Sequence, residues 1–357
     1  MITRRTILKA SLGLASSAAL VPVHARSAEA ISPNLALADY TGSDRAARIL
    51  AAATKEGQVN FYTTIAKSDL EPLFSPFEKK YSVKVNIWRA GDEQVVQRAV
   101  SEARAGRYMP DNVHVGSSFL DNLRQENLLQ PVASPMFADL IPGSVPEHRM
   151  WASTMLSVWV QSYNTNAIKK EELPSSFNDL LLPKWKGKLG LESKSSDWFA
   201  TICQQMSTEK GIAFFKELIA TNGVSVRNGN SLLNNMVASG EVPLALETYN
   251  YMPMQAKRKN APIDWFLLQP AVARANGIAL FKHAPHPAAG MLLYDYMLSM
   301  DAQKILANMD YVPTHRNIPS PFQTSQITPV DPAMSAAERN KWNDLFNHLF
   351  LGSSSHS

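Results

Sequence analysis

The chain has 357 residues, of which 45% are hydrophobic and 18% are charged, and its formal net charge at neutral pH is +4. Residues 1–30 hold four basic residues and one acidic residue, so the rest of the chain carries a net charge of only +1. A nearly neutral chain without a block of basic residues excludes the nucleic-acid-binding class. The single cysteine, Cys203, excludes an intrachain disulfide and a multi-cysteine metal site.

The first residues have the layout of an export signal. The sequence "TRRTILKA" (Thr3 to Ala10) puts paired arginines directly before an apolar run that ends near Leu20. This run is 11 residues long, whereas a membrane-spanning helix needs about 20. Cleavage after Ala25 and cleavage after Ala30 both fit the preference for small residues at the cut. We therefore expect residues 1–30 to be a twin-arginine signal peptide that is removed on export, and the mature protein to lie in the periplasm.

Strands and helices alternate in the next part of the chain. Runs of β-branched and aromatic residues at 58–64, 83–90 and 111–118 predict strands, and helical patterns follow them at 68–81, 92–106 and 119–128. Ser68 and Glu71 have the spacing of a capping box at the start of the first of these helices. Such alternation indicates parallel strands joined by helical crossovers, and hence an α/β fold.

Two long extended segments interrupt this alternation. Residues 151–168 form a β-rich stretch with no helical pattern, after which strands and helices alternate again, and a second extended stretch covers 273–285. A chain that crosses twice between two lobes has this layout. We therefore predict two α/β lobes, which share the chain as follows: residues 31–157 and 278–315 in the first, residues 158–277 and 316–357 in the second. The crossings would act as hinges near Val158–Tyr163 and Asn276–Leu280.

Hydroxyl and amide side chains occupy the turns that follow four of the predicted strands. In open α/β sheets, ligands bind at the carboxyl ends of strands, beside helix N-termini whose free N–H groups favour negative charge. Each of these residues also suits a helix cap, so ligand contact and capping remain alternatives. The residues are Thr63 and Thr64, Ser117 and Ser118, Ser195 and Ser196, and Asn230 and Ser231.

Arg89 and Trp159 are further candidates for ligand contact. Arg89 lies at the end of a predicted strand, where its planar guanidinium could grip a carboxylate or phosphate, or pair with Asp92 or Glu93 at the surface. Trp159 could stack on a ligand or pack in the core. For both residues the sequence leaves the two roles open.

Glu247, Tyr249 and Tyr251 alternate along one short stretch. If this stretch is extended, residues at i, i+2 and i+4 share a face, so a carboxylate and two phenols would point the same way. Such a set could clamp a ferric ion, or it could surround an organic ligand. His283 and His286 also have a spacing that suits a metal, but the prolines between and after them favour a loop that enters a helix.

Signatures of enzymes are missing from the sequence. It holds no G-x-S-x-G, H-E-x-x-H, G-x-x-x-x-G-K or G-x-G-x-x-G motif. We therefore expect a protein that is not an enzyme, with no catalytic residue and no cofactor.

Several stretches, in order over about residues 56–315, resemble the periplasmic solute-binding proteins of ABC importers. They include "VNFYTTI", "LPKWKGKLGLE", "GEVPLALETYNY" and "GIALFKHAPHPAAGMLLYDYMLSMDAQKIL". The chain is most similar to the ferric-iron-binding (bacterial transferrin-like) group and its relatives for small anionic solutes. The resemblance implies the type 2 periplasmic-binding-protein fold, with two α/β lobes that close on solute by a hinge. It also implies an ABC permease at the inner membrane as partner, and we expect a monomer.

The chain departs from the iron-binding members at their metal ligands. Those members use two adjacent tyrosines, a histidine after the first strand and a glutamate after the third. Here Asn250 separates the tyrosines, the first loop has no histidine, and the third-strand loop offers serines. We therefore expect a small anionic solute, organic or phosphorylated. Ferric iron or a ferric chelate is the alternative ligand, and a periplasmic enzyme or a ligand-presenting partner of a membrane sensor is the alternative from another class.

Overall fold

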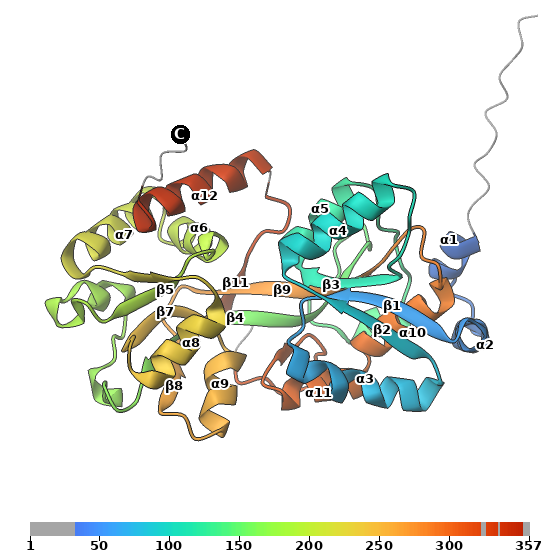
Figure 1. Ribbon diagram of the computed structural model, residues 1–357, viewed down its shortest axis with the longest axis horizontal. Coiled ribbons are helices and arrows are strands. Elements are labelled where there is room, and N and C mark those ends of the chain that lie inside the picture. The colour runs from blue at the N-terminus through green and yellow to red at the C-terminus, as the bar shows by residue number, and fades with distance from the viewer. Residues whose placement is uncertain (1–32, 323–325, 335, 353–357) are drawn as a thin grey trace, which may run out of the picture. The chain divides into compact units, whose positions relative to one another are not determined.

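A computed structural model of the protein describes residues 33–322, 326–334 and 336–352 (Figure 1). The expected signal peptide, residues 1–30, lies outside the described residues. The strands are β1 (Gln58–Thr63), β2 (Lys84–Arg89), β3 (Asn112–Gly116), β4 (Ala152–Asn164), β5 (Leu189–Glu192), β6 (Ser225–Arg227), β7 (Leu244–Tyr249), β8 (Ile263–Phe266), β9 (Ala271–Leu280), β10 (Val312–Pro313) and β11 (Ile327–Pro329).

Helices cover both faces of the sheet that these strands form. Figure 1 shows α4 and α5 on one face of the β1 end of the sheet, with α3, α10 and α11 on the opposite face. The helices are α1 (Pro33–Ala38), α2 (Arg45–Glu56), α3 (Lys67–Tyr81), α4 (Asp92–Arg104), α5 (Ser117–Gln125), α6 (Ser196–Gln205), α7 (Thr208–Asn222), α8 (Asn230–Ser239), α9 (Tyr251–Arg258), α10 (Pro287–Leu298), α11 (Met300–Asn308) and α12 (Ala336–Phe350). In the described part of the chain, no helix has both the length and the apolar character that a membrane crossing requires.

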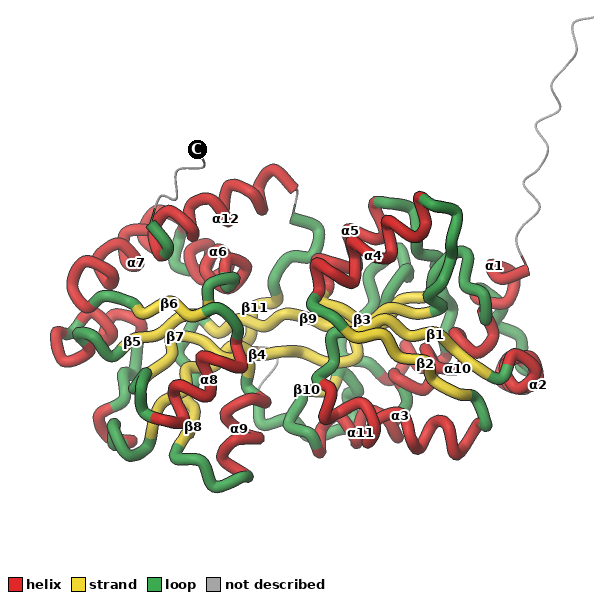
Figure 2. The backbone as a smooth tube through the Cα atoms, in the orientation of Figure 1, coloured by secondary structure: helices red, strands yellow, loops and turns green. Residues whose placement is uncertain are grey.

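The sheet consists of two parallel parts joined by two long antiparallel strands (Figure 2). Its order is β2-β1-β3-β9-β4-β7-β5-β6, with β8 and β10 paired to β4 and β11 paired to β9. β1 is parallel to β2 and β3, and β5 is parallel to β6 and β7, as the strand–helix alternation predicted. β9 and β4 are antiparallel to each other and to their outer neighbours β3 and β7. The extended segments of the sequence are therefore the strands that connect the two lobes.

A glycine allows β4 and β9 to lie close together at one end of their pairing. Ala152 of β4 is opposite Ile278, and Trp159 is opposite Val272. Between them, a Cβ on Gly277 would lie 2.5 Å from the carbonyl oxygen of Ala152, a distance that no side chain tolerates. The register also shifts between Ser153 and Met155, so the pairing is irregular at this point.

Buried apolar side chains form two large clusters, one on each side of the β4–β9 crossing. The first draws its members from Ala38 to Met155 and again from Ile278 to Tyr311. The second draws its members from Trp159 to Val272 and again from Val330 to Phe346. The two-lobed fold agrees with this distribution. The lobe boundaries after residues 157 and 277 remain our proposal, which the membership of the clusters supports.

The sequence did not predict every element. The capping box is wrong, because α3 begins at Lys67 and Ser68 lies inside the helix, where its hydroxyl donates to Asp69 (2.8 Å). Helices α1, α2, α9 and α12 were not expected. α12 follows β11 and lies alongside α6 (Figure 1).

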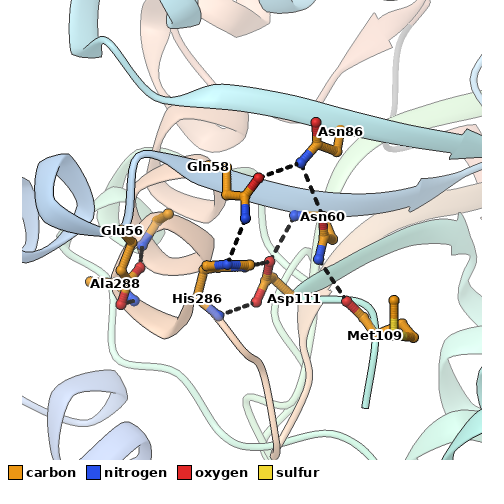
Figure 3. Close-up of polar contacts among 9 residues, drawn as sticks. Glu56, Gln58, Asn60, Asn86, Met109, Asp111, His286 and Ala288 are labelled. Atoms are coloured by element: carbon orange, nitrogen blue, oxygen red, sulfur yellow. Dashed lines mark hydrogen bonds and ion pairs between the residues drawn. The ribbon is translucent and has the colours of Figure 1, made fainter. Parts of the chain in front are cut away.

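A buried carboxylate fixes the start of α10 against β1 and β3 (Figure 3). Asp111 accepts hydrogen bonds from the backbone N–H groups of Asn60 (2.7 Å) and His286 (2.5 Å), and it pairs with the ring Nδ1 of His286 (3.0 Å). Glu56, at the end of α2, accepts a hydrogen bond from the backbone N–H of Ala288 in the first turn of α10 (3.2 Å). His286 therefore shapes the loop that enters a helix, which is the role that the neighbouring prolines favoured.

Asp111→Ala should lower the free energy of unfolding by about 3 kcal/mol or more. Two partly buried backbone N–H groups and the His286 ring would lose their acceptor, at roughly 1–3 kcal/mol for each orphaned group. Asn86→Ala is the control: Asn86 lies at the outer end of the same network, where it donates to Gln58 (3.0 Å), and its loss should cost less than about 1 kcal/mol. Urea unfolding followed by tryptophan fluorescence measures both. Equal losses would contradict this assignment.

Candidate functional site

A cavity of about 1230 Å³ lies at the crossing of the two lobes. Its walls come from the first residues of α3, α4, α6, α8 and α9, from β4 and β9, and from α12. Most of the residues singled out in the sequence line it, namely Thr64, Arg89, Trp159, Ser195, Ser196, Asn230, Ser231, Tyr249 and Tyr251.

Four of the residues singled out in the sequence lie outside this lining. Thr63 is buried, and its hydroxyl accepts a hydrogen bond from the backbone N–H of Ile65 (3.1 Å). Ser117 and Ser118 are buried at the start of α5, and their hydroxyls have no hydrogen-bond partner among the described residues. Glu247 is fully buried beneath the cavity wall. The structure therefore brings together residues that follow three of the four predicted strands.

Alternate residues of β4 and β9 form the floor of the cavity. Met155, Ser157 and Trp159 of β4 line it, as do Arg274 and Asn276 of β9. Ser157 is opposite Arg274 and Met155 is opposite Asn276, so these side chains share one face of the pair. Asn276 donates to the hydroxyl of Ser157 (2.8 Å). The strands that connect the lobes thus carry the polar centre of the site.

Arg274 places a positive charge on this floor. Its side chain is only 15% exposed, and its guanidinium lies 5.5 Å from the ring centre of Tyr249. Nη2 is 3.4 Å from Oδ2 of Asp92, and the buried Nε has no hydrogen-bond partner within the described ranges. Gly116 leaves room for this group, because a Cβ there would lie 3.1 Å from the guanidinium carbon. A guanidinium has five N–H groups in a fixed fork, which suits a carboxylate or phosphate.

Three tyrosines form one side of the cavity, and two of them meet across a turn. β7 ends at Tyr249, Asn250 has helical backbone angles (φ −46°, ψ −42°), and Tyr251 begins α9. The expectation that Tyr251 continues an extended segment is therefore wrong. The rings of Tyr249 and Tyr251 are nevertheless parallel, with centroids 6.0 Å apart, and the Tyr311 ring lies 4.5 Å from that of Tyr251.

Asn250, which separates the two tyrosines, holds this turn in place. Its amide oxygen accepts a hydrogen bond from the backbone N–H of Val158 (3.1 Å), and its amide nitrogen donates to the carbonyl of Asp310 (2.8 Å). Asn250 is fully buried. The residue that breaks the adjacent-tyrosine pattern is thus part of the structure that positions both phenols.

The three phenols carry protons at neutral pH. Burial raises the pKa of Tyr251 to about 12, and burial also raises the pKa values of Tyr249 and Tyr311. The charge of Arg274 lowers the pKa of Tyr249 and of Tyr251, but the effect of burial is larger. Tyr311 donates its hydroxyl proton to Asp69 (2.6 Å).

The turn before α6 uses its hydroxyl groups inside the protein. Ser195 donates to Glu247 (2.7 Å), and Ser196 donates to Asn343 of α12 (2.5 Å). Glu247 also accepts a hydrogen bond from the backbone N–H of Glu192 (3.1 Å). Burial raises the pKa of Glu247 to about 8, so this carboxyl is protonated at neutral pH. A ligand at this turn would meet backbone N–H groups rather than the serine hydroxyls.

Three of the helix N-termini that reach the cavity are those of α4, α6 and α8, whose first residues line it. The first N–H groups of a helix have no acceptor within the helix, and the helix dipole adds a partial positive charge there. In α8, the buried Oδ1 atoms of Asn230 and Asn234 also lack a hydrogen-bond partner within the described residues, and Asn234 is only 6% exposed. The cavity therefore offers unsatisfied polar groups beside positive helix ends.

Arg89 does not form the surface ion pair with Asp92 or Glu93 that the sequence left open, because both carboxylates have other partners. Asp92 pairs with Arg274, and Glu93 pairs with Lys194 (3.2 Å) from the turn before α6. The Lys194–Glu93 pair is exposed, so solvent screens it. Arg89 lines the cavity and donates through Nε to the carbonyl of Ile65 (3.2 Å).

Histidine, cysteine and carboxylate side chains do not cluster in the described residues. No group of three or more His, Cys, Asp and Glu side chains is placed to hold a metal ion there. The carboxylates near the tyrosines have other partners: Asp92 pairs with Arg274, and Asp69 accepts from Tyr311.

Sequence reasoning missed Arg274, Asn276 and the side chains of α12. A signal was available for the first two, because "ARANGIAL" places a charge and an amide at alternate positions of an otherwise apolar strand. A charge inside such a strand needs a partner or a function, since burying an unpaired charge is costly. No local sequence feature indicated that α12 contributes to the site. Its contact with the cavity depends on the path of the chain after β11.

Residues 109–346 match the family described as bacterial extracellular solute-binding protein. The Iron uptake protein A1 of Synechocystis sp. is 23% identical over 341 residues, which cover 86% of this chain and 89% of that protein. These similarities confirm the resemblance to solute-binding proteins that the sequence indicated.

Solved structures of periplasmic binding proteins share the fold. The substrate binding protein of an ABC transporter from Agrobacterium tumefaciens superposes with a TM-score of 0.73 at 14% identity, covering 84% of this chain and 96% of that chain. The periplasmic binding protein AfuA from Actinobacillus pleuropneumoniae, with fructose 6-phosphate bound, superposes with a TM-score of 0.69 at 19% identity, covering 83% and 99%. The predicted type 2 fold is therefore confirmed.

Glu247→Gln should make stability less dependent on pH. The folded protein keeps the proton on Glu247 up to about pH 8, whereas the unfolded chain loses it near the ordinary pKa of about 4.3. The stability that this group contributes is therefore fully present below about pH 4.3 and is lost as the pH rises to about 8, with a slope of at most about 1.4 kcal/mol per pH unit. Urea unfolding at several pH values in this window measures the effect. The variant should gain stability relative to the wild type as the pH rises, and parallel curves would show that the buried carboxyl is ionised.

Proposed function

Because the chain belongs to the bacterial extracellular solute-binding protein family, we propose that it captures a small organic or phosphorylated anion in the cavity and delivers it to the permease of an ABC importer. The protein would act in the periplasm after removal of residues 1–30, and as a monomer. The proposed ligand-binding residues are those that line the cavity, with Arg274 and Asn276 added to the residues found in the sequence.

The observation that carries this proposal is the guanidinium of Arg274 on the cavity floor. It is largely buried, it has one long contact to Asp92, and its Nε lacks a partner in the described residues. A buried cation of this kind attracts an anion strongly, because little water screens it. The N-termini of α4, α6 and α8 add partial positive charge around the same space.

The size and lining of the cavity favour an organic ligand over a bare ion. Its volume of about 1230 Å³ exceeds what a single ion fills, and ligand sites for small molecules are typically about 300–1,000 Å³. Tyr249, Tyr251 and Trp159 supply aromatic surface beside the charged floor. AfuA, which shares the fold, holds fructose 6-phosphate, a solute of the proposed class.

Ferric iron is the second candidate ligand. A relative is named as an iron uptake protein, and three tyrosines meet in this cavity. Against iron, Arg274 places a fixed positive charge beside Tyr249. The first loop, Thr63–Thr64, also provides no histidine. These features favour the anion.

Arg274→Gln should weaken anion binding by about 10- to 100-fold. The loss corresponds to about 1.5–3 kcal/mol, the usual contribution of hydrogen bonds to a charged group. The measurement is calorimetry with inorganic phosphate, citrate and fructose 6-phosphate, comparing the variant with the wild type for the anion that binds most tightly. Arg89→Gln should have a smaller effect, because Arg89 is exposed and already donates to Ile65.

The control for this experiment is Arg104→Gln. Arg104 is exposed, pairs with Glu126 and does not line the cavity, so binding should be unchanged. Wild-type affinity in Arg274→Gln, or no binding of any of the three anions by the wild type, would contradict the proposal.

Ferric citrate should produce no tyrosinate-to-iron charge-transfer band in the visible spectrum at neutral pH. Binding of iron through Tyr251 would bring a trivalent cation next to the charge of Arg274, and no group of three or more His, Cys, Asp and Glu side chains in the described residues is placed to complete its coordination. The check is a spectral titration of the wild type, of Tyr251→Phe and of Tyr163→Phe, a tyrosine that does not line the cavity. A band that is lost only in Tyr251→Phe would promote the iron alternative.

A further inference from the structure

The C-terminal helix α12 presents a polar stripe to the cavity. Arg339, Asn343 and Asn347 recur at every fourth position and all line the cavity. Residues four apart lie on the same face of a helix, so these side chains form one row. This row is separate from the floor that carries Arg274, because it comes from a helix that begins after the chain has returned to the second lobe.

An adjacent apolar stripe anchors α12 on α6, and Figure 1 shows these two helices next to each other. Trp342, Phe346 and Phe350 also recur at every fourth position. Each of their rings lies 5.8 Å from the ring of Phe199 in α6, and the Phe350 ring lies 5.9 Å from that of Phe215 in α7. The helix is therefore held by packed aromatic contacts, which fixes the direction in which the polar stripe points.

A hydrogen bond couples this stripe to the start of α6. Ser196 donates its hydroxyl proton to Oδ1 of Asn343 (2.5 Å). The bond uses the amide oxygen and leaves the two N–H groups of the amide to donate elsewhere. Asn343 thus stands beside the positive N-terminus of α6, within the space where an anionic solute would lie.

The cavity has amide groups on a second wall as well. The buried Oδ1 atoms of Asn230 and Asn234 in α8 lack partners in the part of the chain that the structure describes. Buried polar groups are normally hydrogen-bonded, so these acceptors call for donors from a ligand or from water. Amides that both donate and accept, on two walls, suit the hydroxyl groups of a solute.

We propose that the α12 stripe is a specificity-determining wall that contacts the part of the solute away from Arg274. This inference rests on the proposed function and deepens it: the solute has an anionic end on the floor and a polar, hydroxyl-bearing body that reaches α12. An inorganic anion bound at Arg274 would contact the floor without this wall. Asn343 and Asn347 would then favour the binding of larger anions, whereas the anionic group itself would be bound by Arg274.

Asn343→Ala and Asn347→Ala test this inference against a matched control on the same helix. Asn340→Ala removes the same side chain from an exposed position that does not line the cavity. Calorimetry with fructose 6-phosphate, citrate and inorganic phosphate gives the affinity of each protein for larger and smaller anions. Thermal unfolding of each variant reports on folding, and Asn347, which is exposed, keeps the test available should Asn343→Ala fail to fold.

The stripe variants should bind the tighter of the two larger anions about 3- to 20-fold more weakly than the wild type, while phosphate affinity changes by less than about 2-fold. Asn340→Ala should match the wild type with all three anions. Unchanged affinity in both stripe variants would overturn the inference, and so would an equal loss for phosphate, which would indicate a structural effect through Ser196. Binding of phosphate with no binding of either larger anion would also overturn it. If the wild type binds none of the three, the proposed function itself fails, and this inference with it.

Discussion

The antiparallel pairing of β4 with β9 is the constraint on which the rest of the structure depends. These two strands join the parallel parts of the sheet, so they fix where each lobe begins and how the two lobes meet. Because side chains alternate along a strand, the same pairing decides which residues face the cavity. Ser157 comes to lie opposite Arg274 for this reason, and both reach the cavity floor. A shift of one residue would turn these polar groups toward the core and bring apolar neighbours to the cavity.

Burial sets the charges around this floor. Burial keeps three side chains protonated at neutral pH: Tyr249, Tyr251 and Glu247. For each of them, the desolvation penalty of the ionised form is larger than the stabilisation that neighbouring charges and hydrogen bonds would give it. Arg274 stays charged in the same region, with Asp92 as its one ion-pair partner in the described residues. The result is a cavity floor that holds a buried guanidinium, paired with Asp92, beside neutral phenols, although the chain as a whole is nearly neutral. Net charge is therefore a poor guide to the ligand, and the positions of a few buried groups are a better one.

How far the sequence predicts the structure differs between the fold and the site. The sequence predicted most strands, the helices that follow them and the two long extended segments. Each of these features depends on residues that are close together in the chain. The end of β7 was not predicted, because Asn250 forms the turn through hydrogen bonds to Val158 and Asp310, which lie far away in the sequence. The serine turn before α6, a candidate from the sequence, lines the cavity. However, the partners of its hydroxyls, Glu247 and Asn343, come from a strand and a helix that nothing local connects to that turn.

The sequence by itself determined the alternation of strands and helices over most of the chain and the class of the fold. Periodicity, turn residues and helix stops such as Gly106, whose φ is +70° just after the end of α4, act over a few residues and can be recognised without the rest of the chain. The tertiary structure alone decided which side chains share the cavity. Arg274 reaches the floor through strand register, Tyr311 reaches Tyr251 through the packing of the loop after α11, and α12 reaches α6 through aromatic contacts. These relations are set by contacts between distant segments, and pairing and packing choose them only when the whole core has formed.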